Sequence, residues 1–99
     1  MSEDLGLAAP VFQPGEALQR IKRELRELGL TERQGNFERR GVAIARVVVE
    51  GEALDAALVK RPSRNSPEWQ RRQLKSSADA RDFVADLKKK LAGWSDRDE

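Results

Sequence analysis

The spacing of apolar residues changes twice along the chain. Over Pro14–Leu28, apolar side chains recur every three or four positions, which predicts an amphipathic helix with one buried stripe. A second stripe of this kind predicts a helix over Ser76–Ala92 that stops at Gly93. Between them, Gly41–Lys60 is the longest apolar stretch, and it is rich in the β-branched residues that strands favour. The pattern therefore predicts a β-hairpin held between two helices.

The hairpin is expected to reverse at Glu50-Gly51, because Gly51 can supply the positive φ that a tight turn needs. This turn places Arg46 opposite Asp55, a pair of opposite charges that supports the register. The alternative is a bulged turn with Gly51 in the left-handed conformation. That turn shifts the pairing by one residue and moves the apolar side chains of the second strand to the other face.

Both faces of the predicted hairpin are mostly apolar. One face is expected to form the floor of the core. The other needs either a covering helix or a partner, so it is a candidate interface for a homodimer or for another protein. The apolar residues of this outer face are Val42, Ile44, Val48 and Val59.

A third strand is predicted over Glu68–Lys75 (EWQRRQLK), after a loop at Arg61–Pro67 that contains two prolines. Trp69 and Leu74 fall on opposite faces of a regular strand. The charged side chains of this strand fit a position at the edge of the sheet, where charge discourages aggregation.

These elements predict a fold of the α+β class: a single two-layer domain with a three-stranded antiparallel meander between two helices (α-β-β-β-α). Thr31–Asn36 is expected to be a polar connector before the first strand. The domain is expected to span residues 12–94. A disordered leader is expected over residues 1–11, and a disordered tail over residues 95–99.

Composition narrows the function. The 99 residues include no cysteine and no histidine, which excludes disulfides, the commonest zinc ligands and histidine-based nucleophile systems. No glycine-rich phosphate loop is present. We therefore expect a protein that is not an enzyme and that uses neither a metal nor a cofactor. No apolar run approaches the ~18 residues of a membrane span, and the N-terminus lacks a signal-peptide pattern, so a cytoplasmic location is expected.

Positive charge is concentrated in the strand region. The net charge of the chain is only +2, yet residues 37–75 carry nine basic and five acidic side chains, a balance of +4. Mobile arginines beside a tryptophan suit contact with a nucleic-acid backbone together with base stacking. We therefore expect a protein that binds single-stranded or structured nucleic acid through residues 60–75 and the nearby basic residues. The candidate contact residues are Arg39, Arg40, Lys60, Arg61, Arg64, Trp69, Arg71, Arg72 and Lys75.

Two alternatives stay open. In the first, the arginines form a solvated basic edge on a highly charged protein, in which 36% of the residues are charged. The second alternative is a protein-interaction or structural module that dimerises, or binds a partner, through the apolar outer face of the hairpin.

Two family patterns bear on these expectations. The order α-β-β-β-α resembles the double-stranded-RNA-binding domain, but the last helix opens SSADARD and the hairpin turn reads VEGE, so the determinants of that family are missing. Residues 37–92 combine a meander, a basic strand ending in Leu-Lys-Ser and a closing amphipathic helix. In this they resemble the single-stranded-DNA-binding domain of a transcriptional coactivator family. That resemblance implies pairing as a dimer and DNA contact through basic strands.

Overall fold

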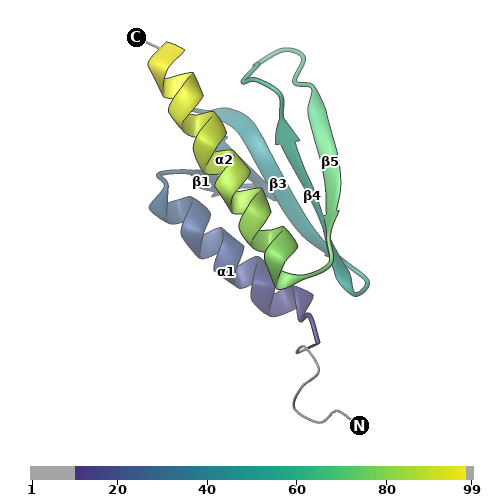
Figure 1. The fold of residues 1–99 in the computed structure, drawn as a ribbon. Helices are drawn as coiled ribbons and strands as arrows, with labels where there is room; N and C mark the ends of the chain where they lie inside the picture. Colours follow the sequence, from purple (N-terminus) through teal and green to yellow (C-terminus); the bar gives the residue numbers. More distant parts are fainter. Residues whose placement is uncertain (1–10, 98–99) are drawn as a thin grey trace, which may run out of the picture.

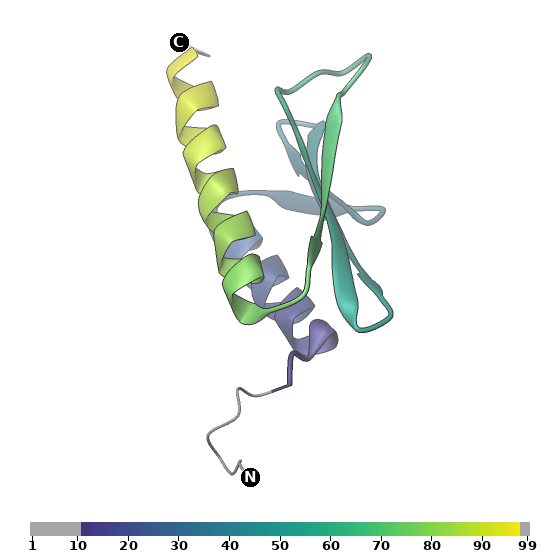
Figure 2. The ribbon, with the colours of Figure 1, turned by 45° about the vertical axis from the view of Figure 1, so that its right-hand side comes forward.

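The computed structural model describes residues 11–97, with the backbone alone described for residues 95–97. The five strands form one antiparallel sheet in the order β1-β2-β3-β4-β5 (Figure 1). Both helices pack side by side on one face of this sheet, and Figure 2 shows that the opposite face carries no helix. The elements are α1 (Pro14–Glu27), β1 (Thr31–Arg33), β2 (Asn36–Arg39), β3 (Val42–Glu50), β4 (Ala53–Val59), β5 (Trp69–Leu74) and α2 (Ser77–Arg97).

The α+β class with a helix at each end is confirmed, but the three-stranded meander is wrong, because the sheet has five strands. Thr31–Asn36, expected to be a connector, contains β1 and the turn into β2. Both residues of the Gln34-Gly35 turn have positive φ (53° and 82°), and so do both residues of the Arg40-Gly41 turn (56° and 80°). This is the pattern of type I′ hairpins. The resemblance to the double-stranded-RNA-binding domain therefore rests on a strand order that this chain does not have.

The central hairpin turns one residue later than expected. Glu50 pairs with Ala53, so Gly51 and Glu52 form the turn. Gly51 has a φ of 63°, whereas Glu52 does not have a positive φ. Glycine thus takes the first central position, as a type II′ turn requires. In the expected turn, Gly51 would have taken the second central position. A type I′ turn of that kind also requires a positive φ at Glu50.

The pairing is therefore shifted by two residues relative to the expected register. A shift of two keeps every side chain on its expected face, because side-chain direction alternates along a strand. The expected pairing of Arg46 with Asp55 is nevertheless wrong. Arg46 lies opposite Ala57, and Val48 lies opposite Asp55.

A β-bulge in β3 changes the direction of the side chains at the start of this strand. Phe37 of β2 pairs with Ala45, but the next residue, Glu38, pairs with Ala43. Ile44 is the extra residue between these two pairs. Ile44 and Ala45 are consecutive, and both are fully buried in the core. The bulge therefore turns two neighbouring side chains of β3 inward.

The continuous apolar outer face expected for the hairpin is not formed. Ile44 and Val59 are fully buried in the core. Val42 pairs with Arg39, which alternation in β2 places on the same side as the buried Phe37. Of the four candidate interface residues, only Val48 is largely exposed, at 41%. That the chain forms a homodimer or binds a partner protein stays a prediction, but the apolar surface on which it was based is not formed.

The helix α2 extends further than its sequence pattern predicts. It continues through Gly93 to Arg97, because Trp94 follows Leu87 and Leu91 at helical spacing and is 7% exposed. Ser76 caps its start: the Ser76 hydroxyl accepts a hydrogen bond from the backbone N–H of Asp79 at 3.1 Å. The tail expected at residues 95–99 is thus helical as far as residue 97. The last two residues, and the leader apart from Val11, lie outside the described residues.

The turn between β1 and β2 gives a test of the fold. We expect Gly35→Ala to lower the free energy of unfolding by about 1–2 kcal/mol, because a side chain disfavours the left-handed region. Gln34→Asn should raise it by about 0.5 kcal/mol, because asparagine adopts this region more readily. Urea unfolding measures both. Gly15→Ala, at an ordinary φ within α1, is the control. If Gly35→Ala unfolds at the same urea concentration as this control, the turn is not as described.

Candidate nucleic-acid interface

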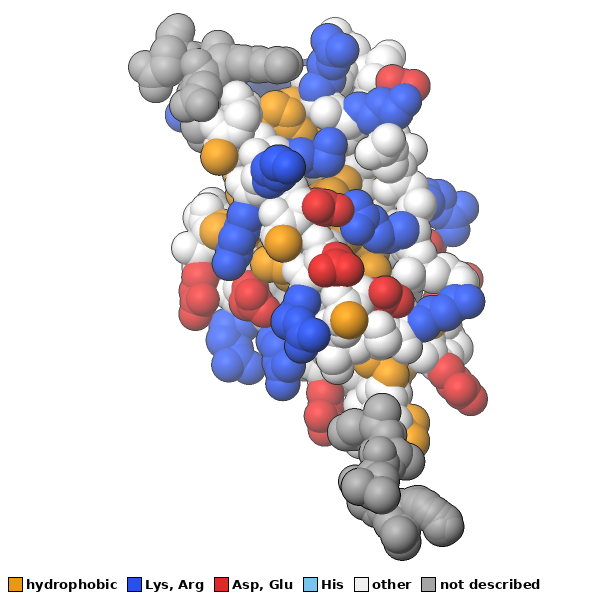
Figure 3. Space-filling model, in the orientation of Figure 1, with side chains coloured by type: hydrophobic (Ala, Val, Ile, Leu, Met, Phe, Trp, Pro, Cys, Tyr) orange, Lys and Arg blue, Asp and Glu red, His pale blue; other side chains and the backbone are white. Residues whose placement is uncertain are grey.

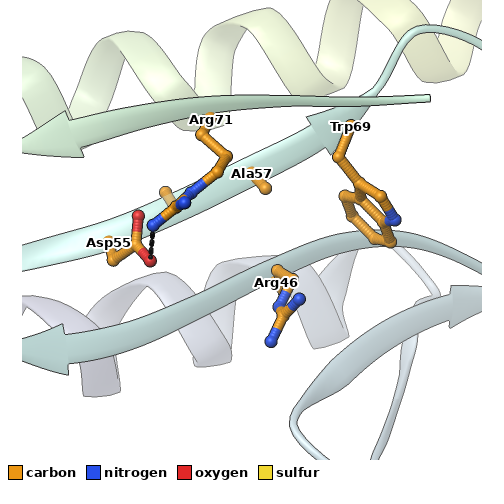
Figure 4. A pocket seen from close by; sticks show the side chains of 6 residues that line it. Arg46, Asp55, Ala57, Trp69 and Arg71 are labelled. Carbon is orange, nitrogen blue, oxygen red and sulfur yellow. Dashed lines mark hydrogen bonds and ion pairs between the residues drawn. The ribbon is translucent and has the colours of Figure 1, made fainter.

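Side chains of β3, β4 and β5 converge on the sheet face that the helices leave uncovered, which we call the open face. They line a shallow pocket of about 360 Å³ (Figure 4). The register explains why they meet: Arg46 lies opposite Ala57, and Ala57 lies opposite Arg71. Trp69 is two residues from Arg71 on β5, and Asp55 is two residues from Ala57 on β4, so both project from the same face. Because β4 and β5 are antiparallel, they lie on opposite sides of the line from Arg46 to Arg71.

Trp69 projects from β5 across β4 toward β3 (Figure 4). The guanidinium carbon of Arg46 lies 6.0 Å from the centre of its ring, which is the outer limit of a cation–π contact. Ala57 lies on the strand between them, and its single methyl group leaves room for the larger side chains. Trp69 is half-buried and packs against the hydrophobic core.

Arg71 is anchored by Asp55. Its Nη2 atom donates a hydrogen bond to Asp55 Oδ2 at 2.9 Å, and the two side chains are 72% and 23% exposed respectively. The arginine is thus the exposed partner. A guanidinium has five N–H donors, and this bond uses one of them. Asp55 therefore positions Arg71 and leaves most of its donors for solvent or an anion.

Arg72 points to the opposite face of the sheet. Its Nη2 atom donates to Asp86 Oδ2 of α2 at 2.9 Å, and its guanidinium carbon lies 5.5 Å from the centre of the Phe83 ring. Arg72 therefore connects β5 to α2. The prediction that Arg71 and Arg72 share one binding surface is therefore wrong, because they project from opposite faces of the sheet.

The remaining candidate residues lie at two ends of the sheet. In an antiparallel meander, the β2–β3 turn and the β4–β5 loop lie at the same end, beside Trp69. This end carries Arg39, Arg40, Lys60, Arg61 and Arg64. Lys60 forms an ion pair with Glu68 at 3.6 Å, whereas Arg61 and Arg64 are exposed without an ion pair to any described residue. Lys75 lies beyond the other end of β5, next to the start of α2.

Arg46 is not among the contact residues predicted from the sequence. The expected register paired it with Asp55, which explained its presence as a structural charge pair. The observed register instead pairs Asp55 diagonally with Arg71 and leaves Arg46 beside Trp69. Placing the turn at Gly51-Glu52 would have given the observed register, in which Arg46 is not paired with Asp55.

The helix-covered side of the molecule carries charges of both signs. Acidic and basic side chains are interspersed over the helices (Figure 3). A polyanion would meet repulsion as well as attraction there. Among the described residues, no three acidic side chains come together in a way that could hold a metal ion. The helices of this part of the chain are also too polar or too short to cross a bilayer.

The fold and the site define a small α+β protein with an open-faced antiparallel sheet. No protein-family model matches the chain, and no curated protein or solved structure matches it either. Its function must therefore be inferred from the geometry of the open face.

The two neighbouring arginines of β5 give a test of this geometry. We expect Arg72→Gln to lower the free energy of unfolding by about 1 kcal/mol, because it removes an ion pair and a cation–π contact. Arg71→Gln, the matched control, should change it by less than about 0.5 kcal/mol. Urea unfolding of both variants checks this. Equal losses of stability would contradict the assignment of the two side chains to opposite faces.

Proposed function

We propose that the protein binds single-stranded nucleic acid on the open face of its sheet. The observation that carries this proposal is the placement of Trp69 beside Arg46, with Arg71 two residues further along β5 in the same pocket. An accessible indole stacks on any base, because every base has an aromatic face. Arginine binds phosphate through paired N–H donors. Both groups that a single strand needs are thus present within one pocket.

The partial exposure of Trp69 favours a single strand over a duplex. Bases in a duplex are stacked on one another and cannot lie against a side chain without being unstacked. The open face also presents a broad sheet, whereas duplex grooves are usually read by an inserted helix or a two-stranded ribbon. Structured nucleic acid fits where it exposes an unpaired loop.

The basic end of the sheet supports the same proposal. Arg61 and Arg64 lie in the loop that leads directly into Trp69, and both are exposed. Charges on such a loop attract a polyanion before close contact is made, and this raises the association rate. The loop therefore extends the electrostatic field of the open face beyond the pocket.

The pocket supports binding rather than catalysis. Its one carboxylate, Asp55, is held by Arg71. General acid–base chemistry needs a group that can take up or release a proton near the reacting bond. The other charged groups of the pocket are the guanidinium groups of Arg46 and Arg71, which can donate hydrogen bonds but accept none.

Fluorescence anisotropy with a labelled single-stranded oligonucleotide tests the proposal. We expect micromolar binding at about 50 mM salt that weakens roughly 10-fold at about 200 mM salt, as two or three phosphate contacts require. A duplex of the same sequence should bind more weakly. If micromolar protein does not bind the single strand in low salt, the proposed function is wrong.

Trp69 gives a second, more local prediction. We expect Trp69→Leu to weaken binding at least about 10-fold, because stacking contributes roughly 1–3 kcal/mol per base while leucine preserves much of the apolar packing. In a Trp94→Phe background, Trp69 is the sole tryptophan, and the oligonucleotide should quench its fluorescence. Wild-type affinity in a folded Trp69→Leu variant would show that no base stacks there.

A further inference from the structure

One line of residues crosses the whole open face. Each member is the direct cross-strand partner of the next, so all of them project from the same side of the sheet. We call this line the transverse row. Its members, from β1 to β5, are Arg33, Asn36, Arg46, Ala57 and Arg71.

The arginines of the transverse row are evenly spaced. They occupy the first, third and fifth strands, and the shorter side chains of Asn36 and Ala57 lie between them. Neighbouring strands are about 4.8 Å apart, so successive arginines are rooted about 10 Å apart and the row spans roughly 19 Å. The row is therefore a line of separated positive charges at right angles to the strands.

Each of these arginines keeps donors available. Arg33 is 71% exposed and lies 3.9 Å from a carboxylate oxygen of Glu38, which is 17% exposed; this distance is too long for a hydrogen bond. Arg71 is 72% exposed and donates a hydrogen bond to Asp55, which is 23% exposed. In both pairs the carboxylate lies deeper than the arginine. Arg46 contacts the ring of Trp69. The guanidinium groups of Arg33 and Arg71 are exposed, so a phosphate can reach the donors that these carboxylates do not use.

We infer that the transverse row is a phosphate track, on which one extended single strand crosses the sheet from Trp69 toward Arg33. This inference rests on the proposed function and adds the path and the minimum length of the ligand. Trp69 and Arg71 hold one end of the strand, Arg46 contacts it at the centre, and Arg33 contacts it at the far edge. About four nucleotides cover such a span, at the lower end of the site sizes of small single-strand-binding domains.

The track makes the effect of Arg33 depend on ligand length. A trinucleotide has two internucleotide phosphates, which occupy at most two arginines. Its anchor at Trp69 leaves Arg33 without a phosphate. A decanucleotide reaches all three arginines. We therefore expect Arg33→Gln to weaken decanucleotide binding several-fold and to lower the salt slope by about 0.7, the value for one lost phosphate contact with a single strand.

The experiment compares a labelled trinucleotide and decanucleotide on three proteins: wild type, Arg33→Gln and the charge-matched control Arg23→Gln. Arg23 is exposed on α1, on the helix-covered side of the sheet. The inference is supported if Arg33→Gln weakens decanucleotide binding alone, while Arg23→Gln leaves both ligands bound as in wild type. Circular dichroism establishes that the variants are folded.

Two outcomes overturn the inference, and they can be told apart. If wild type binds the decanucleotide and Arg33→Gln either matches Arg23→Gln or weakens both ligands equally, the strand does not follow the row, but the proposed function stands. If wild type binds neither ligand in low salt, the track and the proposed function both fail.

Discussion

The packing of both helices on one face of the sheet is the constraint that the rest of the structure depends on. The stripes of α1 and α2 bury themselves against alternate residues of the strands, among them Val47, Leu54 and Leu58. Because side-chain direction alternates, the intervening residues must project from the open face. Arg46 and Arg71 are therefore exposed by the same packing that buries the core.

The bulge at Ile44 lets β2 pair with β3 while the apolar side chains of β3 still point toward the helices. It allows Ile44 and Ala45 to enter the core together, while Arg46 keeps its outward direction and pairs with Asn36. The pairing of β2 with the rest of β3 thus brings the β1–β2 hairpin into the same sheet. Without that pairing, the open face would consist of three strands and would end at Arg46.

The sequence predicts those elements whose signals are local. Helical periodicity identified α1 and α2, and Gly51 marked the central hairpin within one residue. The strand β1 was missed because its three residues, Thr31–Arg33, include no apolar side chain and are all exposed. The turns on either side of β2 were missed because glutamine and arginine, rather than asparagine or aspartate, precede their glycines. The contacts of Arg46 depend on register, and an error of one residue in the position of the Gly51 turn was enough to misplace them.

The alternative explanation of the arginines as a solvated basic edge accounts for only part of the open face. β1 and β5 are edge strands, and charge at Arg33 and Arg71 protects such edges from pairing with other sheets. Arg46 lies on β3, the central strand, where every backbone pairing partner is already supplied within the sheet. Protection of an edge gives no reason for a charge at this position, nor for a half-buried tryptophan beside it. The proposed binding of a stacked base and its phosphate would give a reason for both.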